Sequence, residues 1–373
     1  MMKSLFILLL FAAGAALATP VRFYLGTYTD KSSSHGIYTG TLDSETGRLG
    51  SLELAAAASN PSFLAQAPDG KFLYAVTSTN GGSVAAFRVA DDGRRLDWLN
   101  ALPSGSGGCH VSVDASGKNV FVANYGGGSV ASFRTQADGS LAPLVSLFRA
   151  TGSGPNPQRQ TKPYLHSIYA GPGNHRVYAC DLGTDSIWIF NLAADTGALT
   201  PVNPTVAKVP PGSGPRHLAW HPNGRFAYVN GEMGMNVTAL QLDGETGALT
   251  AFQTLPTLPA GVDTNGMTTA EIICHPSGKW LYVSNRDVAD HGRDSIAVYA
   301  IGADGKLTWQ QDAPAGVKVP RGLGLDPAGQ WLIAAGQNDN RIVVLKVDAA
   351  TGKLSATDQT ASVGSPVCVV FAK

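Results

Sequence analysis

The chain has 373 residues, of which 27 are basic and 27 acidic, so its formal net charge at pH 7 is zero. Only 14% of the residues are charged, and such a neutral chain lacks the basic surface that binds DNA, RNA or anionic lipid, which excludes those partners. Glycine supplies 44 residues and proline 22, and this turn-rich composition favours a soluble all-β protein.

The beginning of the chain has the layout of a secretory signal peptide. Lys3 precedes an apolar run from Leu5 to Leu17, and the small residues of "ALA" end at Ala18. The apolar run is too short to cross a bilayer as a helix. We therefore expect cleavage of the chain after Ala18 rather than insertion of this segment into the membrane. The sequence therefore predicts a signal peptide over residues 1–18, a mature domain over residues 19–373, and a periplasmic or secreted protein without a membrane partner.

One phrase recurs along the mature chain: an apolar strand, a glycine-containing turn and a second strand. Its turns and second strands read "APDGKFLYAV" from Ala67, "DASGKNVFVA" from Asp114, "AGPGNHRVYAC" from Ala170, "HPNGRFAYVN" from His221, "HPSGKWLYVS" from His275 and "DPAGQWLIAA" from Asp326. The landmark residues of the second strands lie 47 to 57 positions apart and are Tyr74, Phe121, Tyr178, Tyr228, Tyr282 and Ile333. A repeat of about fifty residues is typical of propeller blades.

Two more strands are expected in each repeat. A third strand follows the landmark, as in "GSVASFRT" from Gly128 and "DSIAVYAI" from Asp294. A turn and an edge strand come next, as in "ETGALTAF" from Glu245, where the turn residues and the alternation are hairpin signals. Four short strands per repeat predict a β-propeller.

The two ends of the mature chain complement each other. The segment "VRFYLGTY" from Val21 is a second strand without a first strand, whereas "SPVCVVFAK" from Ser365 is a first strand with nothing after it. Joined, they complete a seventh blade, so the predicted fold is an all-β, seven-bladed β-propeller closed by its N- and C-terminal strands. A two-layer sandwich would not explain why the end strands complement each other.

The four cysteines, Cys109, Cys180, Cys274 and Cys368, lie far apart and form no C-x-x-C pair. Their spacing matches neither a zinc site nor a disulfide-dense scaffold. We therefore expect four free, buried thiols.

In a propeller blade, the first strand lines the central channel and the second strand returns antiparallel beside it. The start of strand one and the end of strand two therefore reach the same mouth of the channel. Strand-one starts place Cys109, His110, His166, Ser167, Arg216, His217, Glu271 and Arg321 there. Strand-two ends add Thr27, Tyr28, Asn124, Tyr125, Asp181, Glu232, Asn285, Arg286 and Gln337. Crowding so many ionisable groups in a weakly charged chain indicates a functional site.

His217 and His221 are four residues apart, a spacing that would pair them on a helix. On a strand, four steps separate two residues by about 13 Å. His217 begins a first strand and His221 belongs to a turn that recurs at His275. We therefore predict that His221 and His275 are structural turn residues.

The phrases "GCHVSVDASGKNVFVANYGGGSV", "YLHS", "GPRHLAWHPNGRFAYVNGE" and "VPRGLGLDPAGQWLIAAGQNDNRI" resemble those of the seven-bladed propeller lactonases typified by bacterial 6-phosphogluconolactonase. The resemblance covers essentially the whole mature chain. It implies hydrolysis of a sugar lactone without a defined metal, and relatives in the family close muconate-type lactones. By matching motif, it places the family's channel-mouth residues at His110, His166, Arg216, His217, Glu232, Arg286 and Arg321, with Glu271 where an acidic residue is usual.

Opening a lactone needs an activated water and donors for the developing oxyanion. We expect His166 or His217 to be the general base, with Glu271 or Glu232 orienting it, since a neutral imidazole can take the water proton. Arginine suits an oxyanion or an anionic substituent. The predicted substrate-binding residues are Arg216, Arg286, Arg321, His110, Tyr125 and Gln337. The sequence has no G-x-S-x-G elbow for a serine nucleophile.

Three other functions stay open at this point. A metal-dependent gluconolactonase could bind a divalent cation through Glu232, Asn285, Asn124 and Asp181, although the nearby arginines would repel the ion. A non-catalytic envelope ligand-binding propeller is a second alternative, because fold alone does not prove catalysis. A muconate-type lactonising cyclase is the third. The expected partner is a small-molecule lactone, and we expect a monomer because the ring closes on itself.

Overall fold

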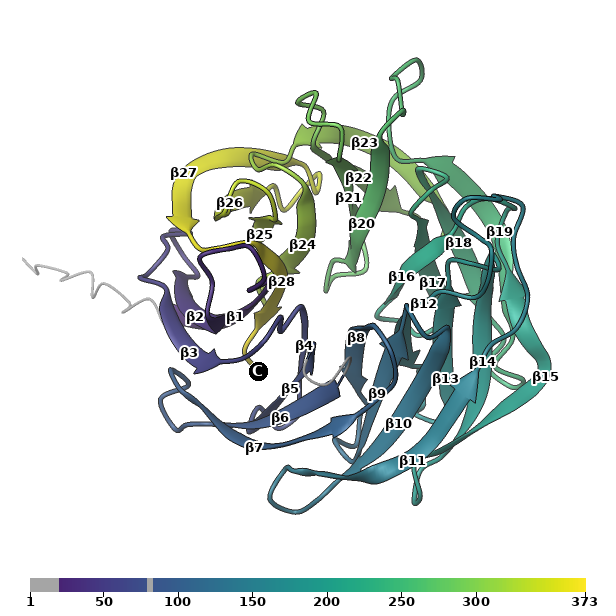
Figure 1. Cartoon of the computed structure of the whole chain (residues 1–373). Coiled ribbons are helices and arrows are strands. Elements are labelled where there is room, and N and C mark those ends of the chain that lie inside the picture. Colours follow the sequence, from purple (N-terminus) through teal and green to yellow (C-terminus); the bar gives the residue numbers. More distant parts are fainter. Residues whose placement is uncertain (1–19, 79–82) are drawn as a thin grey trace, which may run out of the picture.

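The computed structural model describes residues 20–78 and 83–373, which form seven four-stranded antiparallel sheets arranged in a ring (Figure 1). The predicted signal peptide, residues 1–18, lies outside the described residues. Within the described ranges, all regular elements are strands, and no helix is long and apolar enough to cross a membrane. The predicted seven-bladed β-propeller is confirmed.

Each blade runs from an inner to an outer strand. Blade by blade, the strands are β28 (Pro366–Phe371), β1 (Pro20–Thr27), β2 (Gly36–Asp43) and β3 (Glu53–Ala57); β4 (Phe63–Gln66), β5 (Phe72–Thr77), β6 (Ser83–Val89) and β7 (Leu96–Pro103); β8 (Gly108–Val113), β9 (Asn119–Asn124), β10 (Ser129–Thr135) and β11 (Leu141–Arg149); β12 (Leu165–Ala170), β13 (Arg176–Asp181), β14 (Ser186–Ala193) and β15 (Ala198–Lys208); β16 (Pro215–Trp220), β17 (Phe226–Gly231), β18 (Asn236–Leu242) and β19 (Leu249–Pro256); β20 (Met267–Cys274), β21 (Trp280–Asp287), β22 (Ser295–Ile301) and β23 (Leu307–Pro314); β24 (Pro320–Leu325), β25 (Trp331–Gly336), β26 (Arg341–Val347) and β27 (Leu354–Ser362).

The two chain ends close the ring, as predicted. β28 pairs antiparallel with β1, and the register places Phe23 opposite Phe371 and Leu25 opposite Val369. The innermost strand of this blade is therefore the last strand of the chain, beside β24 on one side and β4 on the other.

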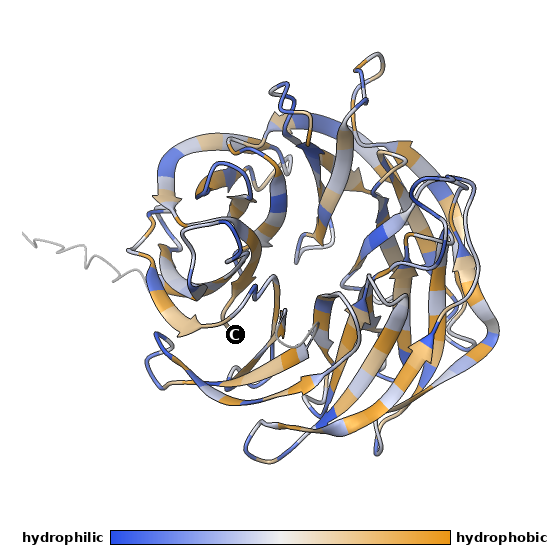
Figure 2. Cartoon of the chain, in the orientation of Figure 1, coloured by the Kyte–Doolittle hydropathy of each residue, from blue (hydrophilic) through white to orange (hydrophobic). Residues whose placement is uncertain are grey.

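The core lies between neighbouring blades. Hydrophobic residues concentrate on the strands, whereas the connecting loops are mostly hydrophilic (Figure 2). One cluster joins Tyr282 and Val298 to Leu332 and Leu345 of the following blade. Each blade therefore buries its faces against the blades on either side, and the hydrophobic clusters between blades connect neighbours around the ring.

The tyrosine landmarks of the repeat connect each blade to the next. The buried Tyr228 hydroxyl donates a hydrogen bond of 3.0 Å to the carbonyl of Gly305, in the turn between the outer strands of the following blade. Tyr24, Tyr74, Tyr178 and Tyr282 make equivalent bonds to Gly93, Gly139, Gly247 and Gly352. A buried bond of this kind contributes about 1 kcal/mol, so the repeated aromatic residue marks the blade-to-blade contact.

The prediction for the two turn histidines is confirmed, and the prediction for the cysteines is confirmed in part. His221 and His275 lie in turns, where their Nε2–H groups donate to the carbonyls of Gly278 at 2.9 Å and Gly329 at 3.0 Å. The four cysteines are free, as predicted, but only Cys180 and Cys368 are buried; Cys109 and Cys274 are half-buried, so the expected burial is wrong for these two thiols.

Candidate active site

Irregularities in the first strands position the candidate residues. The inner strands β8, β12, β16, β20 and β24 each have a register shift near the start of their pairing with the second strand of the blade. The shifts fall at Gly108/His110, Leu165/Ser167, Pro215/Leu218, Thr269/Ile272 and Pro320/Gly322. The residues inside these shifts include His166, Arg216, His217, Glu271 and Arg321. A β-bulge redirects side chains at the end of a strand. The same local distortion therefore orients candidate residues in several blades around the ring.

A cavity of about 410 Å³ opens at this face of the ring. Its lining residues are Tyr28, Gly107, Gly108, Cys109, Tyr125, Gly126, His166, Glu232, Arg286 and Arg321. Five of the predicted site residues therefore share one cavity wall. The Cys109 thiol contacts the His166 carbonyl at 3.2 Å, and burial raises its pKa to about 12, so the thiol is not a nucleophile at neutral pH.

Glu232 is the centre of a cluster of guanidinium groups. Its Oε1 lies 2.7 Å from Arg159 Nη2, and its Oε2 lies 3.1 Å from Arg216 Nε and 3.3 Å from Arg286 Nη2. Burial alone would raise the pKa of this carboxyl, but the guanidiniums of Arg286 and Arg216 lower it to about 2. Glu232 is therefore ionised throughout the physiological range and is a weak base.

His217 and Glu271 form a buried pair beneath the cavity. The His217 Nδ1 lies 2.8 Å from Glu271 Oε1, and its Nε2 lies 3.2 Å from Arg216 Nη1. Burial and the charge of Arg216 lower the pKa of His217 well below its usual range, so the ring is neutral, donates through Nδ1 and accepts through Nε2. Burial raises the pKa of Glu271 to about 7. Both ring nitrogens of His217 thus have partners within the protein.

His166 is the histidine on the cavity wall. Its Nε2 lies 3.8 Å from Glu232 Oε2, and its buried Nδ1 has no hydrogen-bond partner among the described residues. Burial, followed by the charge of Arg216, lowers the pKa of His166 well below the usual value. A neutral imidazole next to the cavity can accept a proton.

His110 lies deeper. It is buried, accepts a hydrogen bond of 3.4 Å from the Ile168 amide at its Nδ1, and packs against Phe63, Tyr169 and His217. The structure therefore places His110 and His217 below the wall that we expected them to share with His166.

Two arginines on the wall differ in their partners. Arg286 donates to the Thr269 carbonyl at 2.9 Å, and burial lowers its pKa to about 9, so it stays charged at neutral pH. The Arg321 guanidinium lies 5.6 Å from the centre of the Tyr28 ring. Within the described part of the chain, no carboxylate forms an ion pair with Arg321, so this cation is free to bind an anionic or polarised oxygen.

Comparison with known proteins identifies the family. The model of the family "Lactonase, 7-bladed beta-propeller" matches residues 22–371. This chain belongs to the seven-bladed β-propeller lactonases. The chain is 36% identical to the 6-phosphogluconolactonase of Bacillus subtilis, over 93% of this chain and 97% of the relative. It is 31% identical to the 6-phosphogluconolactonase of Formosa agariphila, over 90% and 95% of the two chains.

A solved structure extends the comparison. The periplasmic gluconolactonase of Pseudomonas aeruginosa superposes with a TM-score of 0.86 at 29% identity, over 95% of this chain and 99% of that one. The relatives are lactonases by name and the family model covers nearly all of the chain, so the protein is an enzyme that acts on a lactone.

Sequence reasoning missed Arg159 of this lactonase. Arg159 lies in the loop between β11 and β12 rather than at a strand end, and its guanidinium contacts both the Glu232 carboxylate and the Tyr125 phenol. Tyr125 also packs against His166. The only sequence signal was a pair of cations, Arg159 and Lys162, in a long loop that leads into "YLHS".

The oxygen ligands considered for a cation do not gather in this lactonase. Asn124 donates to the Ser104 carbonyl at 2.7 Å, Asn285 donates to the Thr257 carbonyl at 2.8 Å, and Asp181 accepts from the Tyr164 amide at 2.7 Å. None of the three lines the cavity with Glu232, and both Glu232 oxygens face arginines. In residues 20–78 and 83–373, no group of three His, Cys, Asp or Glu side chains could hold a metal ion. Gln337 lines an adjoining cavity instead.

Proposed function

We propose that this lactonase hydrolyses a sugar lactone in the cavity lined by His166, Glu232, Arg286 and Arg321, after export to the periplasm or the medium. The observation that carries the proposal is the excess of cations. Arg159, Arg216 and Arg286 contact one carboxylate of low pKa, Glu232. Arg321 has no carboxylate partner among the described residues, and the pKa of the other acid of the site, Glu271, is about 7. Preorganised guanidiniums stabilise the oxyanion that develops when a lactone carbonyl is attacked.

The proposed reaction begins with water bound beside His166. His166 takes one proton while the water oxygen bonds to the lactone carbonyl carbon, and the carbonyl oxygen becomes an oxyanion facing Arg321 and Arg286. The bond from this carbon to the ring oxygen then breaks, and the ring oxygen takes the proton back from His166. The product is an open-chain hydroxy acid.

We assign His166 rather than His217 to the proton transfer. His166 lines the cavity, whereas His217 lies below it with Nδ1 bonded to Glu271 and Nε2 bonded to Arg216. His217 and Glu271 are positioning residues in this proposal, because they fix the orientation of Arg216. Arg216 in turn holds Glu232 Oε2, whereas Arg159 holds Oε1.

A pH-indicator assay of the purified mature protein tests the proposal. Glucono-, galactono- and 6-phosphogluconolactone and an aromatic-derived muconate-type lactone are compared with the spontaneous rate. We expect acid release from at least one sugar lactone, and a loss of about 10²- to 10⁴-fold in His166→Ala. His221→Ala is the matched control, because this turn histidine lies outside the cavity. Turnover of the muconate-type lactone alone would favour the cyclase, and an unchanged His166→Ala would remove the assignment.

The location of the enzyme needs its own test. The leader predicted at residues 1–18 and the name of the Pseudomonas aeruginosa relative, a periplasmic gluconolactonase, support export. We expect the protein in the periplasmic fraction or the medium, with a mature N-terminus at Thr19. A cytoplasmic protein that retains Met1 would contradict this part of the proposal.

A further inference from the structure

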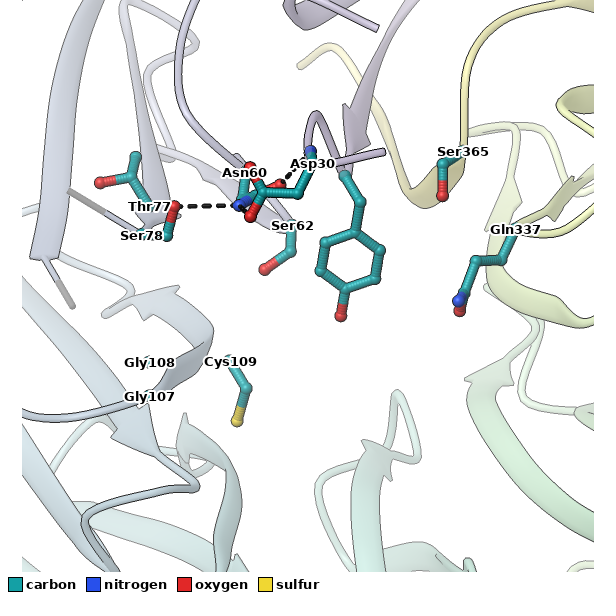
Figure 3. Close-up of a pocket in the computed structure, with 11 residues that line it drawn as sticks. Asp30, Asn60, Ser62, Thr77, Ser78, Gly107, Gly108, Cys109, Gln337 and Ser365 are labelled. Atoms are coloured by element: carbon teal, nitrogen blue, oxygen red, sulfur yellow. Dashed lines mark hydrogen bonds between the residues drawn. The ribbon is translucent and has the colours of Figure 1, made fainter. Parts of the chain in front are cut away.

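A second cavity adjoins the candidate active site. It has a volume of about 460 Å³ and shares Tyr28, Gly107, Gly108 and Cys109 with the cavity that contains His166 (Figure 3). Its other lining residues are Asp30, Asn60, Ser62, Thr77, Ser78, Gln337 and Ser365. Two of the four shared residues are consecutive glycines, which have no side chains to divide the space. The two cavities therefore meet around Tyr28.

The lining of this second cavity differs in charge from that of the first. Its described lining residues include no arginine or lysine, and its one acid, Asp30, accepts a hydrogen bond of 2.6 Å from Asn60. The first cavity, in contrast, is lined by Arg286 and Arg321. A group bound in the second cavity would therefore meet hydroxyls and amides rather than guanidiniums.

Several of these polar groups are available to a ligand. Within the described residues, the Ser62 and Ser365 hydroxyls and the Gln337 side-chain amide form no hydrogen bond with another residue. Figure 3 shows the Ser62 and Gln337 side chains pointing into the open space between the surrounding loops. Neutral groups that both donate and accept hydrogen bonds match the hydroxyls of a sugar.

The size of the combined space also bears on the substrate. Small-molecule sites occupy about 300 to 1,000 Å³, and each of the two cavities reaches this range by itself. A single sugar lactone bound by the arginines would leave the second cavity to solvent. Tyr28, half-buried where the two cavities meet, offers an aromatic ring against which a second sugar ring can pack.

We infer that the preferred substrate is a disaccharide aldonolactone, whose lactone ring binds among the arginines while its second, uncharged sugar ring occupies the cavity lined by Ser62, Gln337 and Ser365. This inference rests on the proposed lactone hydrolysis and names its substrate class. The reaction that supplies such a substrate is oxidation, at the anomeric carbon, of the reducing-end sugar of a disaccharide. Hydrolysis adds one water to the lactone and gives the corresponding aldobionic acid.

The test compares kcat/KM for cellobiono-δ-lactone with kcat/KM for glucono-δ-lactone, each corrected for spontaneous hydrolysis. We expect the wild-type enzyme to favour the disaccharide lactone at least tenfold. The double variant Ser62→Ala/Gln337→Ala should lower this ratio about tenfold, since each lost hydrogen bond to substrate reduces the constant several-fold. The ratio does not depend on how much of the variant is folded, because both constants come from the same sample.

Two further variants sharpen the result. Gln337→Trp fills the second cavity and should reduce the ratio further, whereas Asn338→Ala, the matched control, changes a neighbour that does not line this cavity. If glucono-δ-lactone is hydrolysed but the ratio is about one in every variant, the disaccharide inference is wrong and the proposed lactonase site stands. If neither lactone is hydrolysed, both proposals are wrong.

Discussion

Replacing Glu232 by Gln removes a carboxylate that three guanidiniums share. In the folded protein, Arg159, Arg216 and Arg286 all lie within 3.3 Å of its oxygens. The side chain is 8% exposed, so solvent screens these interactions little. The variant keeps the shape of the side chain but leaves buried cations without their partner.

The size of the effect follows from the pKa of Glu232. The guanidiniums lower it from the ordinary 4.5 to about 2, and a difference of this size corresponds to about 3 kcal/mol of folding stability. Breaking a buried ion pair by removing one partner has a similar effect, about 3 to 5 kcal/mol. We therefore expect Glu232→Gln to lower the free energy of unfolding at pH 7 by about 3 kcal/mol.

The same interaction has a defined pH dependence. Because the pKa is lower in the folded state, the stabilisation is complete above pH 4.5 and decreases as the pH falls towards 2. The difference between wild type and variant should therefore be largest at neutral pH and less than half as large at about pH 3.

Urea unfolding followed by tryptophan fluorescence at several pH values measures this difference. Glu245→Gln is the matched control, because Glu245 is exposed and has no ion pair among the described residues. A Glu232→Gln variant as stable as the wild type at pH 7, or a difference that grows as the pH falls, would refute the reasoning.

Three other predictions follow from the site and the fold. In Glu271→Gln, the pH–rate profile of lactone hydrolysis should lose an inflection near pH 7, because burial raises the Glu271 pKa to about 7 beside His217; an unchanged profile would contradict this. Tyr228→Phe should lower the free energy of unfolding by about 1 to 2 kcal/mol in urea titrations, because the buried Gly305 carbonyl loses its donor. Activity should be equal with and without EDTA, because arginines face both Glu232 oxygens; loss in EDTA with recovery in Ca²⁺ or Mg²⁺ would favour the metal-dependent alternative.

The fold could be predicted because one physical contact repeats. The tyrosine landmarks, such as Tyr178 and Tyr228 in adjacent blades, recur once per blade because each donates a hydrogen bond to a turn of the next blade. One exception shows the same requirement. Phe121 has no hydroxyl, and the Ser132 hydroxyl of its blade donates to the Gly197 carbonyl instead. Periodicity thus reflects an interface that every blade must form.

The sequence predicted which residues belong to the candidate site, but not which of them line the cavity and which lie below it. Strand ends indicated that His166, His217 and Glu271 belong to one face, and the structure brings them together. The register shifts that redirect His166 and His217 have no signature in the alternation of the strands, so the sequence did not show that His166 lines the cavity and His217 does not. Arg159 was missed for a related reason, because the position of a loop residue depends on the path of the loop rather than on strand pairing.

The pairing of β28 with β1 means that the first and last strands of the described chain are hydrogen-bonded neighbours. The closed ring therefore has no first or last blade in three dimensions. The chain could begin in another blade and still form the same ring. Joining the present termini with a short linker and opening the ring in a loop between two other blades should give a circular permutant with the same blades. Until the final residues of the chain are in place, however, the ring lacks an inner strand, so closure is a late and strongly non-local step of folding.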